Sequence, residues 1–200
     1  MHAGPASAWA GLALVIACAV LTRQQLRHWE NTEALFRHAL AVTRENHVAQ
    51  VGLGIELARK ERFDEAIGHY REALRLKPGF ALAHNDLGYA LLRNGQFDAA
   101  IEQYREAIRL KPDYLLAHHN LGNAYYLAGR DDEAIRQYQE ALRLKPDNPN
   151  AHNDLGIALF RKGRREDAAR EFQEALRLDP GHADARTNLE AMRITTPPRP

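Results

Sequence analysis

The sequence predicts an all-α fold built from repeated pairs of antiparallel helices. The first observation is a set of prolines that stand 34 residues apart without slippage: Pro78, Pro112, Pro146 and Pro180. The second is that small and aromatic residues keep the same offset, namely Gly54, Gly88, Gly122 and Gly156, then Ala66, Ala100, Ala134 and Ala168, then Tyr70, Tyr104, Tyr138 and Phe172. A period of this length is typical of helical repeat proteins. We therefore expect an α-solenoid.

Each repeat is predicted to hold two amphipathic helices. Leu87 and Leu91, and one helix later Tyr104 and Ile108, recur at helical spacing. Glycines at 95, 129 and 163 are placed to close the first helix in a left-handed conformation, and the prolines stop the second. The expected order is a hydrophobic membrane helix at 1–22, a half-repeat helix at 23–46, repeats at 47–80, 81–114, 115–148 and 149–182, a capping helix at 183–194 and a disordered tail at 195–200.

This pattern resembles the tetratricopeptide repeat family. The stretch AHNDLGYALLRNGQFDAAIEQYREAIRLKP, residues 83–112, carries the family's Leu-Gly, Ala, aromatic, Ala and Pro positions. The resemblance implies a right-handed superhelix with a concave groove, and it implies that Gly88 faces Ala100 and Ala107. Glu61 stands where later repeats have glycine, so we expect the first repeat to turn less cleanly.

The amino-terminal segment predicts a membrane anchor. No Lys, Arg, Asp or Glu occurs from Met1 to Thr22, and residues 8–21 form an unbroken apolar run near the lower length limit for a span. We expect residues 6–22 to contact the membrane, with Trp9 and Arg23 at its two interfaces. A cleaved signal peptide, a lipoprotein box ending at Cys18 and a buried soluble helix are the alternatives.

The joint after this run also predicts a half repeat. Trp29, Phe36 and Leu40 fall at the offsets of a second helix. The joint resembles transmembrane tetratricopeptide proteins with a mannosyltransferase-like membrane domain, which implies that this chain is the carboxy-terminal part of a membrane glycosyltransferase whose catalytic region lies elsewhere. The side of the membrane on which the array lies stays open, because Arg23 and Arg27 favour the cytoplasm whereas this resemblance implies the outside.

The family geometry implies a groove that binds a protein or peptide partner. The residues it assigns to the groove are Asn85, Asp86, Tyr89, Leu92, Arg93, His119, Asn120, Asn123, Tyr126, Asn153, Asp154, Ile157, Phe160, Arg161 and Asn188, with Leu82, Leu116, Leu127 and Asn150 beside them. Such amide, phenol and apolar groups suit an extended or helical peptide. A solvated inner face without a dedicated ligand is the alternative.

Four of these positions form a ladder, Asp86, Asn120, Asp154 and Asn188, which resembles the asparagine ladder of peptide-glycosylating relatives. Because a carboxylate only accepts hydrogen bonds, this version is expected to favour peptide N–H groups and basic side chains. The basic clamp of chaperone-tail binders is missing, because Asn85, His119 and Asn153 occupy its positions.

Composition and side-chain chemistry exclude several classes of function. A net charge of +1 produces no strong positive potential that would attract nucleic acid. A single cysteine allows neither a disulfide within the chain nor a cysteine-rich zinc site. His84, His118 and His152 recur in register, but stacked repeats hold them too far apart to share a metal ion. We expect no catalytic set, cofactor, metal or small-molecule substrate. The predicted function is a membrane-anchored interaction scaffold, and the alternative is the tail of a membrane glycosyltransferase.

Overall fold

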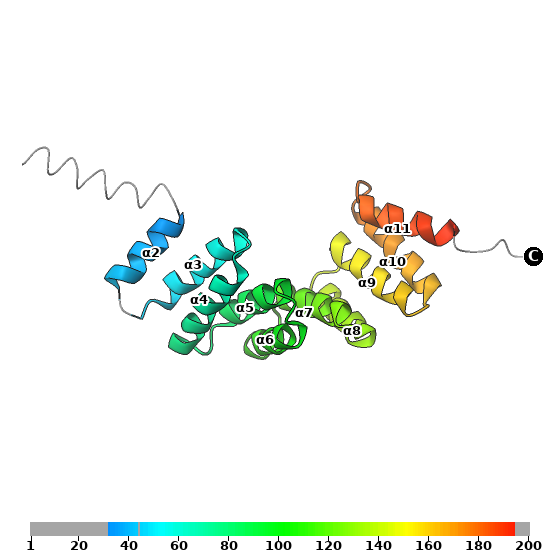
Figure 1. The fold of residues 1–200 in the computed structure, drawn as a ribbon. Helices are drawn as coiled ribbons and strands as arrows, with labels where there is room; N and C mark the ends of the chain where they lie inside the picture. The colour runs from blue at the N-terminus through cyan, green and yellow to red at the C-terminus, as the bar shows by residue number, and fades with distance from the viewer. Residues whose placement is uncertain (1–31, 44, 195–200) are drawn as a thin grey trace, which may run out of the picture. The chain divides into compact units, whose positions relative to one another are not determined.

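The computed structural model describes residues 32–43 and 45–194, and every regular element in these ranges is an α-helix (Figure 1). The chain divides into two compact units, Met1–Lys77 and Pro78–Pro200, here called unit 1 and unit 2. Each unit is described by itself.

Unit 1 contains three described helices: α2 (Thr32–Val42), α3 (His47–Arg59) and α4 (Phe63–Leu76). The Phe36 ring of α2 lies directly on Gly52 of α3. Glu33 also fastens α2, because it accepts hydrogen bonds from Lys60 Nζ at 2.7 Å and Arg62 Nη1 at 3.2 Å. Hydrogen bonds from Lys60 and Arg37 lower the pKa of Glu33 to about 2. Packing and charge together hold α2 on the α3–α4 pair.

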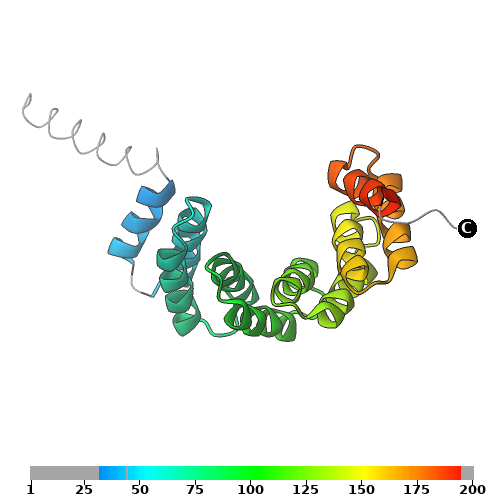
Figure 2. The same ribbon diagram turned by 45° about the vertical axis from the view of Figure 1, so that its right-hand side comes forward.

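Unit 2 contains seven described helices. They are α5 (Ala81–Arg93), α6 (Phe97–Leu110), α7 (Leu115–Leu127), α8 (Asp131–Leu144), α9 (Pro149–Arg161), α10 (Arg165–Leu178) and α11 (Ala183–Ile194). The first helices α5, α7, α9 and α11 touch one another in sequence, and α6, α8 and α10 pack behind them (Figure 2). The surface made by the first helices is called the first-helix face.

In the helix pairs of unit 2, an aromatic ring of the second helix packs directly on a glycine of the first helix. A Cβ atom added to Gly88 would lie 2.8 Å from the Tyr104 ring, and one added to Gly156 would lie 2.6 Å from the Phe172 ring. Ala100 and Ala107 are fully buried, but they are not the nearest neighbours of Gly88. The facing of Gly88 toward Ala100 and Ala107 stays a prediction, because the three atoms nearest to an added Cβ all belong to Tyr104, which was not predicted to lie there. The small residue accommodates the ring of the paired helix.

The turns inside the repeats have a left-handed residue. Gly95 and Gly129 have φ of 75°, and Glu61 takes the same place in unit 1 with φ of 59°. The hydrogen bond from Arg62 N to Leu57 O, at 3.0 Å, also matches that of the later turns. The expected looser turn at Glu61 was wrong, although a non-glycine residue in this conformation costs about 1–2 kcal/mol.

The predicted membrane helix at 1–22 and the tail at 195–200 lie outside the described residues. Within 32–43 and 45–194, no helix has the length and apolar character that a bilayer crossing requires.

Candidate partner-binding face

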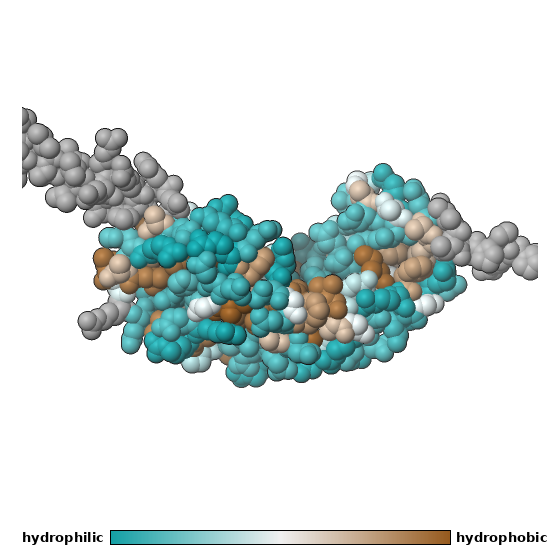
Figure 3. All heavy atoms as spheres, viewed as in Figure 1, coloured by the Kyte–Doolittle hydropathy of each residue, from teal (hydrophilic) through white to brown (hydrophobic). Residues whose placement is uncertain are grey.

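The predicted groove residues all lie on the first helices of unit 2. Five are on α5, four on α7, five on α9, and Asn188 is on α11. Apolar atoms gather over α7 on the side of the molecule seen in Figure 3. The side chains divide into an inner polar network and an outer set of exposed apolar groups.

Two of the predicted contact residues are buried. Asn85 is 2% exposed and Asn153 is 5% exposed. Asn120 Nδ2 donates to Asn85 Oδ1 at 3.1 Å, and Asn188 Nδ2 donates to Asn153 Oδ1 at 3.0 Å. These asparagines therefore join α5 to α7 and α9 to α11, and burial keeps Asn85 and Asn153 from a partner.

A third bond joins α7 to α9. His119 Nε2 lies 2.8 Å from Asp154 Oδ2, and Asp154 Oδ1 also accepts from Asn153 Nδ2 at 3.3 Å. Both oxygens of this carboxylate are thus used inside the protein. Its expected preference for partner N–H groups or basic side chains has no support from this geometry.

Asp86 lies in a different environment. Its Oδ1 accepts from Asn85 Nδ2 at 3.1 Å, but within the described part of the chain its buried Oδ2 has no hydrogen-bond partner. Burial raises the pKa of Asp86 to about 6, because the charged form loses its hydration. The Tyr104 hydroxyl is also buried without a partner among these residues, and burial raises its pKa as well.

The outer set is apolar and aromatic. Its exposed members, with their exposed fractions, are Tyr89 (39%), Phe160 (37%), Leu82 (40%), Leu116 (49%) and Leu127 (54%). Leu92, Asn123, Tyr126 and Ile157 are half-buried between them. Large side chains held open to solvent on one face are typical of an interaction surface.

The two arginines of the face are held against aromatic rings. Arg93 Nη1 donates to Tyr89 Oη at 2.8 Å. The Arg161 guanidinium lies 3.5 Å from the centroid of the Tyr126 ring, donates to the Tyr126 carbonyl at 2.6 Å and pairs with Asp131. Both guanidinium groups therefore already interact with other groups of the same protein.

Sequence models of one repeat family match most of the chain. Two matches described as tetratricopeptide repeat cover residues 20–81 and 51–114, one described as TPR repeat covers 122–163, and another tetratricopeptide repeat covers 149–182. This chain is a tetratricopeptide repeat protein.

Solved structures have the same fold. The crystal structure of MamA is 25% identical with a TM-score of 0.72, covering 81% of this chain and 95% of that one. MamA from Desulfovibrio magneticus RS-1 is 23% identical with a TM-score of 0.71, covering 82% and 94%. YrrB, described as a TPR protein with an unusual peptide-binding site, is 22% identical with a TM-score of 0.68, covering 80% and 82%. The comparison with curated proteins gives no significant match. The link to mannosyltransferase-like membrane proteins is not shown.

The in-register histidines hold this tetratricopeptide array together. Their Nε2 atoms donate to the carbonyl of the preceding repeat's proline, and Arg186 does the same at the end of the array: His84 to Pro78 at 2.9 Å, His118 to Pro112 at 3.0 Å, His152 to Pro146 at 3.0 Å and Arg186 to Pro180 at 2.6 Å. Each Nδ1 lies within hydrogen-bond distance of a side chain 19 positions later, as His84 Nδ1 does with Gln103 Oε1 at 2.9 Å. Within the described ranges, no group of three His, Cys, Asp or Glu side chains could hold a metal ion.

Sequence reasoning identified both polar ladders of the tetratricopeptide array but missed their connection. The fifth position of one repeat bonds to the sixth position of the next, an offset of 35 residues, as in Asn85 with Asn120. The complementary side chains at this offset were the available signal. They join neighbouring repeats, whereas the 34-residue period relates equivalent positions only.

Proposed function

We propose that this chain is an interaction scaffold whose first-helix face in unit 2 binds a protein segment through apolar anchor side chains. The observation that carries the proposal is the set of exposed large residues on this face, above all Tyr89, Leu116 and Phe160. Burial of the apolar surface of such groups against a partner contributes about 25 cal/mol per Å² to the free energy of binding.

The chemistry of the face favours an apolar segment over an acidic or a basic one. Arg161 already pairs with Asp131, and Asp154 already accepts from His119. Replacing these internal partners would leave buried or half-buried charges without compensation. A segment with two or three apolar side chains, with its backbone near the amide groups of Asn120 and Asn123, meets no such penalty. The fold shared with YrrB, which is described as having a peptide-binding site, supports peptide recognition.

The experiment selects short random peptides on the full chain by phage display and measures the enriched peptides by fluorescence anisotropy. Tyr89→Ser, Leu116→Ser and Phe160→Ser should each raise Kd about 10-fold, because central anchors carry most of the energy of an interface. Gln139→Ser is the matched control, since Gln139 is exposed on α8, outside the first-helix face.

Two outcomes would remove the proposal. One is the enrichment of no peptide. The other is a set of peptides whose binding survives all three face variants.

We further propose that residues 6–22 anchor the scaffold in a membrane, on the basis of their charge-free apolar sequence. The full chain expressed in bacteria should stay in the membrane pellet after alkaline carbonate washing, and a chain lacking residues 1–22 should not. Release of the full chain by carbonate would contradict anchoring and leave the peptide-binding proposal untouched.

A further inference from the structure

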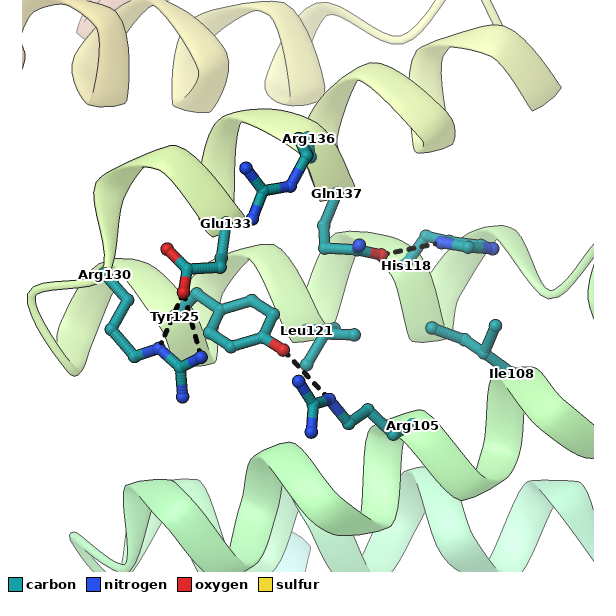
Figure 4. Close-up of a pocket in the computed structure, with 9 residues that line it drawn as sticks. All are labelled: Arg105, Ile108, His118, Leu121, Tyr125, Arg130, Glu133, Arg136 and Gln137. Carbon is teal, nitrogen blue, oxygen red and sulfur yellow. Dashed lines mark hydrogen bonds and ion pairs between the residues drawn. The ribbon is translucent and has the colours of Figure 1, made fainter.

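Unit 2 has a cavity on a side of α7 that the first-helix face does not use. It is a cavity of about 410 Å³ between α6, α7 and α8 (Figure 4). Its lining residues are Arg105, Ile108, His118, Leu121, Tyr125, Arg130, Glu133, Arg136 and Gln137. The proposed partner-binding residues are absent from this lining, so the cavity needs an explanation of its own.

Tyr125 distinguishes this place from the other repeats. Leu57, Leu91 and Leu159 occupy the equivalent positions. The Tyr125 side chain is almost fully buried, yet its Oη accepts a hydrogen bond from Arg105 Nε at 3.0 Å. The leucine of the other repeats has no polar side-chain atom and cannot accept this bond.

The same ring also positions a second guanidinium. The Cζ atom of Arg130 lies 4.6 Å from the Tyr125 centroid, and that of Arg105 lies 5.9 Å from it. In Figure 4 the two guanidinium groups both lie near the Tyr125 side chain. Cation–π contacts of this kind restrict long side chains, so less conformational entropy remains to be lost when a ligand binds.

The lining has an excess of positive charge. Three guanidinium groups, from Arg105, Arg130 and Arg136, and one carboxylate, Glu133, line the cavity, which gives the lining +2 when His118 is counted as neutral. Outside the lining, the exposed Glu102 pairs with Arg105 Nη1 at 3.5 Å. Glu133 Oε1 accepts from Arg130 Nε at 3.1 Å and from Nη2 at 2.9 Å. This pairing uses one edge of the Arg130 guanidinium, and its Nη1 edge makes no hydrogen bond to a described residue.

His118 and Gln137 are already bonded within the protein. His118 Nδ1 lies 2.9 Å from Gln137 Oε1, and His118 Nε2 lies 3.0 Å from the Pro112 carbonyl. The polar groups available to a ligand are therefore mainly guanidinium N–H donors, and Ile108 and Leu121 are the aliphatic residues of the lining.

We propose that this cavity binds a phosphate monoester. A phosphate monoester carries about −1.5 to −2 charge at neutral pH, which matches the excess charge of the lining. Guanidinium groups bind phosphate oxygens through paired N–H donors, and ligand cavities of about 300–1,000 Å³ take small molecules. The phosphate lies between Arg105 and Arg130, Arg136 adds long-range attraction, and the organic part covers the half-buried Ile108.

The test titrates the full chain with inorganic phosphate, phenyl phosphate and a short phosphoserine peptide by calorimetry at low salt. Phenyl phosphate should bind with Kd below about 1 mM. Arg105→Gln and Arg130→Gln should each weaken binding about 10-fold or more, because hydrogen bonds to charged groups are strong. Tyr125→Leu should weaken binding about threefold or more through the lost orientation of the guanidinium groups. That variant restores the residue of the other repeats, so it should fold normally.

The matched control is Arg109→Gln, which removes the same charge from the same helix at a site bonded to Glu106 outside the cavity. Phosphate binding should stay within about twofold of the parent in this variant. Tighter binding of the phosphoserine peptide than of phenyl phosphate would assign the phosphate to a protein partner, and the reverse order would assign it to a small molecule. The proposal fails if no probe binds, or if Arg109→Gln weakens binding as much as Arg130→Gln.

Discussion

The second and fourth repeats carry the same six residues, Ala-His-Asn-Asp-Leu-Gly, at 83–88 and 151–156, but their aspartates differ. Asp154 Oδ2 receives His119 Nε2 at 2.8 Å. Asp86 Oδ2 is buried without a partner among the described residues, and burial raises the pKa of this carboxyl to about 6. An identical local sequence therefore gives one satisfied carboxylate and one unsatisfied carboxylate.

The preceding repeat of the same unit satisfies Asp154. The residue 35 positions before it is His119, whose ring can donate. The second helices repeat the contrast. Tyr138 Oη donates to Asn123 Oδ1 at 2.7 Å, but Tyr104 Oη has no partner in the described part of the chain. A neighbouring repeat thus satisfies Asp154, whereas Asn123 of the same repeat satisfies Tyr138, and Tyr89 stands at the place of Asn123 in the second repeat. The packing of an aromatic ring on glycine is the same in both repeats.

The largest expected effect tests that shared packing. Gly88→Leu and Gly156→Leu should each lower the free energy of unfolding by about 3 kcal/mol, because the new side chain must displace the Tyr104 or Phe172 ring. Urea unfolding followed by circular dichroism measures both. Unequal losses, with one variant near the parent, would show that the two helix pairs do not pack alike.

The next prediction concerns Asp86 and pH. Its folded pKa of about 6 lies above the ordinary value of 3.8, so between these values the folded chain binds more protons than the unfolded chain. Asp86 therefore favours folding when protonated, and its contribution is lost as pH rises through 6. Asp86→Asn, which has the residue found at 120 and 188, should raise the free energy of unfolding above pH 6 by about 2 kcal/mol.

Urea unfolding of the parent and of Asp86→Asn across pH 4 to 8 measures this effect. The advantage of the variant should shrink toward the acid end. A constant difference at every pH would contradict the assigned burial of the Asp86 charge.

A smaller effect of opposite sign is expected at the two tyrosines. Tyr104→Phe removes a buried hydroxyl that lacks a partner and should stabilise by about 1 kcal/mol, whereas Tyr138→Phe removes the bond to Asn123 and should destabilise by about 1 kcal/mol. Phe172 shows that this position accepts phenylalanine. Thermal unfolding of the two variants measures their shifts in Tm. Shifts of the same sign would contradict the prediction.

The smallest effect is expected at Asp154. Asp154→Asn replaces the charged acceptor for His119 by a neutral one and should lower stability by about 0.5 kcal/mol, because both side chains are partly exposed. This change in the free energy of unfolding has the opposite sign to the change expected for Asp86→Asn. Stabilisation by both substitutions would mean that the His119 contact does not distinguish the two repeats.

Most of the fold was accessible from the sequence, but the roles inside the candidate face were accessible only in part. Tyr89 and Phe160 were predicted for the groove and are exposed on the first-helix face. Asn85 and Asn153 were predicted beside them, yet they are buried. The family pattern identifies which helix side a residue occupies, but side-chain length and the neighbouring repeat decide whether it reaches the surface.

The sequence by itself determined the helices, their pairing and the 34-residue period, because these depend on helical spacing and on small residues under aromatic rings within one repeat. Only the tertiary structure decided which polar groups meet: His119 with Asp154, Asn120 with Asn85, and Arg105 with Tyr125. The physical reason is that a hydrogen bond requires two atoms within about 3 Å in a favourable direction. That distance is set by how one repeat stacks on the next, which helical periodicity does not encode.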